Sequence, residues 1–266
     1  MSDNVRELRT GPHSISLVSL EEAVEWVLAA VDEADGPCKQ VMASGFHGLW
    51  AAVSNAQTSD ELSHVDLWVP DGIAPVLMAR LLGASEVARV PGPDLFPAVM
   101  KAAPVEAVLR HFLYGDTDDT LEALHRHIEA TYPRNEVVGV HSPPFTPAAK
   151  VAPSETIDEI NNSGADILWV GLGTPKQDLW IARNRHLLQV PVAVAVGAAF
   201  RFEIGKVDRA PDWVGRSGLE WAYRLTREPR KLWRRVFLEG GQFLAWSAWA
   251  MATGRVTLAE REIEAD

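Results

Sequence analysis

The chain has very little cysteine: Cys38 is the only one among its 266 residues, so no disulfide can form within it. A single thiol fits a reducing compartment without proving one. Long apolar runs are also missing, because the nearest candidate, Phe243–Ala252, has about half of the roughly 18 residues that cross a bilayer. The charged segment Met1–Thr10 lacks the apolar stretch of a signal peptide. We therefore expect a soluble or peripheral protein.

Positive charge is scarce overall, because 25 Lys and Arg face 36 Asp and Glu and the formal net charge is −11. This balance argues against a surface that binds nucleic acid. The exception lies near the C-terminus, where residues 224–235 hold six basic side chains against Glu228 alone: Arg224, Arg227, Arg230, Lys231, Arg234 and Arg235. A local basic patch on an acidic protein suggests a specific anionic partner.

Short apolar runs alternate with helical patterns over most of the chain. The runs, which we predict to be strands, are Gln40–Ala43, Val65–Val69, Val108–Tyr114, Glu136–Val140, Ile167–Val170 and Val190–Val196. The predicted helices are Leu20–Ala34 and residues 46–56, 73–82, 94–103, 118–131, 154–163 and 175–188. This alternation predicts an α/β fold with a Rossmann-like, doubly wound, mostly parallel sheet.

The alternation stops at Pro211, and the tail is predicted to be helical at Gly218–Arg227, Lys231–Leu238 and Phe243–Ala252. The tail holds five of the ten tryptophans and the basic patch. Tryptophan with Arg and Lys is typical of a helix at a membrane interface, although a helical cap on the sheet is an alternative that can coexist with it. We expect an α/β core in residues 1–210 and a helical, membrane-proximal appendage in residues 211–266.

In a doubly wound sheet, ligands bind beyond the carboxyl ends of the strands. Asp71 lies at such a junction, in Pro70-Asp71-Gly72 directly after a predicted strand. A carboxylate there can take a proton from a substrate hydroxyl. The alternative is that Asp71 caps the following helix, a position that Asp favours.

A second junction carries the glycine-rich run Gly171–Asp178. Gly171 and Gly173 let backbone amides approach a phosphate at a helix N-terminus, and Lys176 and Gln177 add donors. The run is not a dinucleotide fingerprint, because Lys176 stands where a third glycine is required and no acid follows near the end of the next strand. It is not a Walker A loop either.

Two further junctions are less specific. Gly197–Phe200 leads to Arg209, which can pair with a phosphate, although a structural turn is an equal alternative. Asp116-Thr-Asp118 has an Asp-x-Asp pattern that holds a metal in some diphosphate sites, and the same acids suit the start of the next helix. His125 and His127 face different sides of a predicted helix, so they do not form a metal pair.

Together these junctions resemble the WecG/TagA/CpsF family of bacterial glycosyltransferases over roughly residues 40–240. The run Asp166–Asp178 is similar to the family's Gly-x-Gly-x-Pro-Lys-Gln-Glu block. The other similar blocks follow in family order: Pro70–Gly72, Arg89–Asp94, Tyr114-Gly115, Val196–Phe200, Arg209–Trp213, Gly218–Trp221, Arg224-Leu225 and Glu228–Arg230.

The resemblance implies an inverting glycosyltransferase that uses a uridine-diphosphate (UDP) sugar. The sugar would be a hexose, an N-acetylhexosamine such as N-acetylmannosamine, or a uronic acid, and the acceptor a polyprenyl-pyrophosphate-linked saccharide. The products of the family are teichoic acid linkage units, enterobacterial common antigen and exopolysaccharides. The resemblance also implies a cytoplasmic protein bound peripherally to the inner face of the cell membrane. No cofactor and no metal ion are expected.

The resemblance gives roles to individual residues. Asp71 matches the proposed base. The residues expected to bind substrate are His47, Arg89, Gly171, Gly173, Lys176, Gln177 and Arg209, with Arg216, Arg224, Arg227 and Arg230 from an appendage that would close over the site. His47 belongs to a departure from the pattern, since Ala43–His47 replaces the commoner Thr-x-Asn. Two other departures, Asp178 for Glu and Arg201 for Asp, leave the identity of the sugar open.

The expected reaction is a direct displacement in which Asp71 deprotonates the acceptor hydroxyl, which attacks the anomeric carbon opposite the departing UDP. Arginine suits the leaving group because its guanidinium pairs with two oxygens of a pyrophosphate. A non-catalytic protein that binds nucleotide sugars or lipid is one alternative, although Asp71, Gln177 and Arg209 are all present. A Rossmann-like oxidoreductase is another, disfavoured by the missing third glycine.

Overall fold

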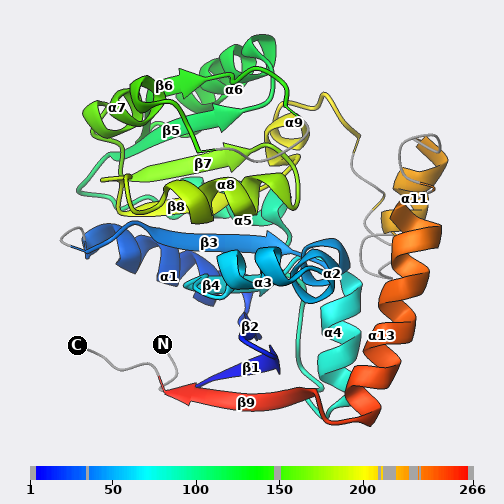
Figure 1. The fold of residues 1–266 in the computed structure, drawn as a ribbon. Coiled ribbons are helices and arrows are strands. Elements are labelled where there is room, and N and C mark those ends of the chain that lie inside the picture. The colour runs from blue at the N-terminus through cyan, green and yellow to red at the C-terminus, as the bar shows by residue number, and fades with distance from the viewer. Residues whose placement is uncertain are drawn as a thin grey trace.

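The structure is a computed structural model that describes residues 4–33, 36–146, 151–208, 211, 220–227, 233 and 235–262. A parallel six-stranded sheet with strand order β4-β3-β8-β7-β5-β6 forms its centre, with helices on both faces (Figure 1). Its strands are β3 (Lys39–Ser44), β4 (Leu67–Pro70), β5 (Leu109–Gly115), β6 (Asn135–His141), β7 (Ile167–Gly171) and β8 (Val192–Ala195). The predicted Rossmann-like, doubly wound fold is confirmed.

The connecting helices match the predicted segments to within a few residues. They are α1 (Leu20–Asp32), α2 (Phe46–Ser54), α4 (Ile73–Leu81), α5 (Gly92–Lys101), α6 (Asp118–Thr131), α7 (Ser154–Asn162) and α8 (Lys176–Asn184), whereas α9 (Ala199–Glu203) was not predicted. The first begins at a capping box, in which Ser19 and Glu22 each bond the other's backbone amide. The prediction omits α3 (Ala56–Leu62), whose sequence buries only Leu62 and therefore has no apolar stripe.

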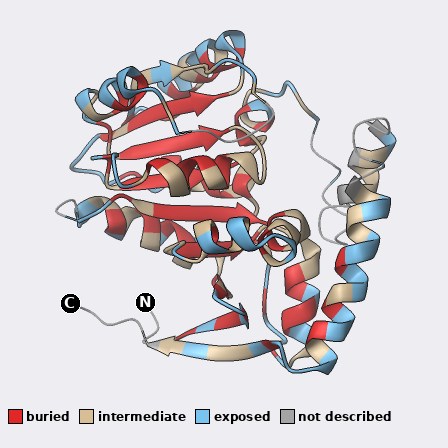
Figure 2. Cartoon of the chain, viewed as in Figure 1, coloured by how far each residue is buried: buried red, intermediate tan, exposed pale blue. Residues whose placement is uncertain are grey.

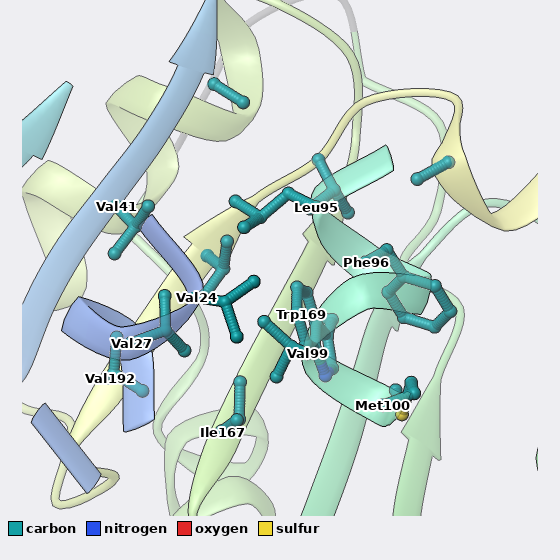
Figure 3. Close-up of a cluster of buried hydrophobic side chains, with 14 of the residues drawn as sticks. Val24, Val27, Val41, Leu95, Phe96, Val99, Met100, Ile167, Trp169 and Val192 are labelled. Carbon is teal, nitrogen blue, oxygen red and sulfur yellow. The ribbon is translucent and has the colours of Figure 1, made fainter. Parts of the chain in front are cut away.

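The apolar core has one layer on each face of the sheet. On one face, α1 and α5 cover the central strands (Figure 3), and the residues labelled there are Val24, Val27, Val41, Leu95, Phe96, Val99, Met100, Ile167, Trp169 and Val192. On the opposite face, α7 and α8 cover Leu168 and Val170, which alternate along β7 with residues of the first layer. Both faces of the central strands are therefore buried (Figure 2), as their apolar sequences predict.

A small antiparallel sheet joins the two ends of the chain and is absent from the predictions. It contains β2 (His13–Ser16), β1 (Asn4–Thr10) and β9 (Val256–Glu262) in that order (Figure 1). Glu7 is buried in it and contacts Arg9 and Arg261 at 3.0 and 3.1 Å. Because β1 and β9 interleave charged and apolar residues, their sequences do not read as buried strands.

In the C-terminal segment before β9, the described residues 220–227 and 235–252 are helical. It contains α11 (Glu220–Arg227), the π-helix η1 (Arg235–Glu239) and α13 (Gly240–Ala252). Phe243 and Ala250 of α13 share a buried cluster with Val76 and Ala79 of α4, and the two helices run side by side (Figure 1). Within the described residues, no helix combines the length and the apolarity that a bilayer crossing requires. The division of the chain at residue 210 stays a prediction.

Two glycines at the carboxyl edge of the sheet give a matched test of packing. Gly115 has φ +117°, and a Cβ there would lie 2.7 Å from the carbonyl carbon of Gly171; Gly173 has φ +82° and open space around it. Gly173→Ala should cost about 1 kcal/mol of unfolding free energy through backbone strain alone. Gly115→Ala adds a clash between backbones and should cost about 3 kcal/mol or more. Urea denaturation of both variants checks this, and equal losses would contradict it.

Candidate active site

The loops that follow the parallel strands meet at one edge of the sheet. The chain leaves β5 towards β6 but leaves β7 towards β8, so the connections after these two adjacent strands diverge. Ligands bind in the crevice that such a divergence opens at the carboxyl ends. β7 ends at Gly171, and the segments that follow β3 and β4, which carry His47 and Asp71, reach the same edge.

Asp71 is held between two loops whose backbones touch. Its amide donates to the carbonyl oxygen of Ser44 at 3.4 Å, and a Cβ on Gly45 would lie 3.0 Å from Cα of Gly72. The cap of α4 is Gly72, with no side-chain cap bond, so the alternative that Asp71 caps this helix is wrong. The half-buried Asp71 thus directly follows the carboxyl end of β4, as its sequence position predicts.

Arg89 belongs to the segment beside Asp71. The next residue, Val90, donates its amide to the carbonyl oxygen of Pro70 at 2.9 Å, which ties this segment to the end of β4. Arg89 itself is half-buried. The structure therefore brings Arg89 and Asp71 to the same end of β4, as their predicted roles require.

The side chain of Gln177 links the glycine loops that follow β7 and β8. Its side chain is fully buried, and Oε1 accepts hydrogen bonds from the amides of Gly173 at 2.9 Å and Gly197 at 3.0 Å. Its Nε2 has no partner among the described residues. Gln177 thus fixes the ends of β7 and β8 relative to each other, in addition to the substrate contact predicted for it.

Replacing Gln177 with Ala should therefore loosen both loops. Two partly buried amides lose their acceptor, and the expected loss of unfolding free energy is about 2 kcal/mol. Denaturant unfolding measures this loss. Gln57→Ala on the exposed face of α3 is the matched control, and wild-type stability of the Gln177 variant would contradict this role.

Lys176 begins α8 and lies under an aromatic ring. Its Nζ is 5.3 Å from the centroid of the Phe145 ring, and that ring is 92% exposed. Partial burial lowers the pKa of Lys176 below its usual value. The amine stays at the first turn of the helix, where it can meet an anionic group.

His47 connects the site to the C-terminal segment. It stands in the first turn of α2, and its Nδ1 lies 2.9 Å from Oε2 of Glu239 on η1. The adjacent ring of Phe46 packs on Phe243 of α13, with ring centroids 5.8 Å apart. The sequence does not indicate this contact, because the two segments are far apart in the chain.

Asp116 is engaged by Arg201 rather than free for a metal. The guanidinium donates to both carboxylate oxygens at 2.7 and 2.9 Å. Burial opposes ionisation of Asp116, but the hydrogen bonds from Arg201 and from the amide of Thr117 outweigh it and lower its pKa. Asp118 instead lies in the first turn of α6. The residues that the structure describes contain no cluster of three His, Cys, Asp or Glu side chains suited to a metal.

Asp178 is a site residue for which the sequence predicts no role. It follows Gln177 in α8, its side chain is 0% exposed, and neither carboxyl oxygen has a hydrogen-bond partner among the described residues. Burial and the nearby negative charge of Asp71 raise its pKa well above the usual value. In the sequence, the only feature that sets this position apart is that Asp178 replaces the glutamate of the family pattern.

The structure describes only some of the tail arginines that are predicted to bind substrate. Arg209, Arg216 and Arg230 lie outside the described residues. Arg224 and Arg227 lie in α11, where the structure describes the backbone but not these side chains. Their roles, and those of the other predicted site residues, remain predictions.

Comparison with known proteins shows the family to which the chain belongs. The sequence profile of the glycosyl transferase WecG/TagA/CpsF family matches residues 10–256. The chain belongs to this family. It is therefore a glycosyltransferase, which confirms the predicted family and enzyme class and rules against the oxidoreductase alternative.

Two relatives from Bacillus are similar over most of their length. One, from Bacillus spizizenii strain W23, is 33% identical over 185 residues, which cover 70% of this chain and 69% of the relative. The other, from Bacillus subtilis strain 168, is 32% identical over 187 residues, or 70% of each chain. Both are named N-acetylglucosaminyldiphosphoundecaprenol N-acetyl-beta-D-mannosaminyltransferase.

Proposed function

We propose that this glycosyltransferase moves an N-acetylhexosamine, with N-acetylmannosamine as the first candidate, from a UDP-sugar to a polyprenyl-diphosphate-linked saccharide of the cell envelope. The observation that carries the proposal is the position of Asp71, a half-buried carboxylate at the carboxyl end of β4, in a member of this family. The acceptor and the sugar are those in the names of the two relatives. A hexose or a uronic acid remains the alternative donor sugar.

The proposed reaction inverts the anomeric carbon in one displacement. Asp71 accepts the proton of the acceptor hydroxyl, the oxygen bonds to the anomeric carbon, and the bond to UDP breaks on the opposite side. The amides of the loop after β7 and the positive end of α8 would stabilise the diphosphate. Preorganised donors of this kind are worth about 3 kcal/mol each in a transition state. We propose that no metal ion is needed, because Lys176 and the arginines of the tail would supply the positive charge.

We also propose that the C-terminal segment binds the inner face of the cell membrane. Five large apolar side chains of this segment are 47% to 67% exposed: Trp233, Phe237, Leu238, Leu244 and Trp249. Leu77 and Leu81 of the neighbouring α4 are exposed too, at 48% and 74%. Apolar side chains next to a basic segment are suited to an interface with anionic lipids. Because His47 contacts η1, lipid binding would place the acceptor beside the site.

A transfer assay with a panel of donors tests the proposed function. Labelled UDP-sugars are offered with an N-acetylglucosaminyl-diphosphate lipid, with and without a chelator. We expect label from one donor in the lipid phase under both conditions. Loss of transfer with the chelator would contradict metal independence. Binding of donors without transfer to any lipid would favour the non-catalytic alternative.

A further inference from the structure

The reaction proposed above makes no use of Asp178, although its carboxyl group is buried at the same end of the sheet. Both oxygens are inaccessible, and no residue that the structure describes bonds to them. Buried polar atoms are rarely left unpaired, and a carboxylate ion without partners is far more costly to bury than a neutral acid. The environment of Asp178 therefore favours the form that carries a proton.

The position of Asp178 is fixed by its neighbours rather than by its own side chain. Nε2 of Gln40, from β3, donates to the carbonyl oxygen of Asp178 at 2.8 Å in the buried interior. The preceding residue, Gln177, is held by the amides of Gly173 and Gly197. Because hydrogen bonds hold the backbone on both sides, the carboxyl group has a fixed, buried position in the first turn of α8.

Asp71 and Asp178 are both bonded to β3, Asp71 through the carbonyl oxygen of Ser44 and Asp178 through the side chain of Gln40. The negative charge of Asp71 opposes ionisation of Asp178. The elements packed on α8 are α3, β3, β7 and β8. Among them only β3 carries a Lys or Arg, and that residue, Lys39, pairs with Glu33. The charged groups on or near α8 are engaged elsewhere: Arg183 with Glu61 of α3, Arg185 with Asp66, and Lys176 beneath Phe145.

We propose that Asp178 is a positioning residue that keeps its proton while Asp71 is ionised, so that the pair holds one negative charge, on the base. This proposal rests on the proposed role of Asp71. During transfer, Asp71 takes the hydroxyl proton and the pair becomes neutral; Asp71 then returns that proton to water after the product leaves. Asp178 keeps its own proton throughout. A second negative charge would repel the diphosphate of the donor.

The pH dependence follows from this arrangement. A group whose pKa is raised stays neutral below that pKa and ionises as the pH rises through it. Transfer should therefore fall on the alkaline side when Asp178 loses its proton. Asp178→Asn stays neutral at every pH, so its pH profile should lack this fall. Asp60→Asn, on the exposed face of α3, should keep the wild-type profile.

A spectroscopic titration tests the proposal without any transfer. In protein labelled with ¹³C at the aspartate carboxyl groups, one resonance should report a protonated acid at pH 7 and be missing from Asp178→Asn. In Asp71→Asn, the same group should ionise at a lower pH because the neighbouring charge is gone. An ionised Asp178 at pH 7, or a midpoint that Asp71→Asn leaves unchanged, would overturn the proposal.

The two readouts separate this inference from the proposed function. If the wild type transfers no sugar while the titration gives the expected result, the proposed function fails. The conclusion that Asp178 is protonated beside an ionised Asp71 is then retained. If Asp178→Asn is folded and binds UDP but is as inactive as Asp71→Asn, then Asp178 is not a neutral positioning residue and the proposal is overturned.

Discussion

Asp71→Asn is expected to lower the rate of sugar transfer by about a thousandfold, which is within the range for loss of a general base. Asparagine keeps the shape of the side chain, but its amide does not take up a proton at neutral pH. The backbone contacts that hold this loop, from the Asp71 amide to Ser44 and from Val90 to Pro70, do not involve the carboxylate. The variant should therefore fold normally and bind UDP with wild-type affinity.

The measurement is the turnover of labelled donor by Asp71→Asn beside its binding of UDP. Asp60→Asn, an exposed aspartate on α3, controls for the loss of one negative charge. Transfer within a few-fold of the wild type would mean that another group accepts the hydroxyl proton. Loss of UDP binding together with transfer would instead give Asp71 a role in holding the donor.

The exposed apolar side chains of the C-terminal segment should account for most of the binding to lipid. Leu244 and Trp249 on α13 are 67% and 49% exposed, so replacing both with Glu should leave the fold intact. A large apolar side chain contributes about 1.5–3 kcal/mol when it leaves water. The double variant should therefore bind anionic vesicles on the order of a hundredfold more weakly.

Vesicle sedimentation checks this expectation. Leu187→Glu is the matched control, because Leu187 is exposed at 41% but follows the C-terminal end of α8, far along the chain from α13. The control should bind vesicles like the wild type. Undiminished binding by the double variant would remove α13 from the proposed membrane contact.

The sheet was predictable because its strands obey one simple physical rule. A central parallel strand is covered on both faces, so runs such as Val192–Ala195 are apolar throughout, and helices with an apolar stripe separate them. The small sheet of β1, β2 and β9 obeys no such rule. Its strands have one exposed side, and buried Glu7 interrupts their apolar pattern. Pairing between the two ends of the chain leaves no local signal in the sequence.

In the candidate site too, some features have a local signal in the sequence and others have none. Asp71 was predictable because a strand followed by an acid and a glycine places that acid at the carboxyl edge. The bonds of Gln177 to two loops and the contact of His47 with Glu239 join segments distant in the chain, and neither has a local signature. Asp178 reads as an ordinary acid in the first turn of a helix, and only the structure shows that its carboxyl group is buried without partners.

The most direct test of the proposed transfer is the structure of its product. Wild-type protein is incubated with UDP-N-acetylmannosamine in the α configuration and an N-acetylglucosaminyl-diphosphate lipid, and the anomeric configuration of the new linkage is read by NMR. Displacement assisted by Asp71 predicts a β-linked disaccharide on the lipid. An α linkage would contradict the single displacement, and free sugar released into water without a lipid product would contradict transfer to the lipid acceptor.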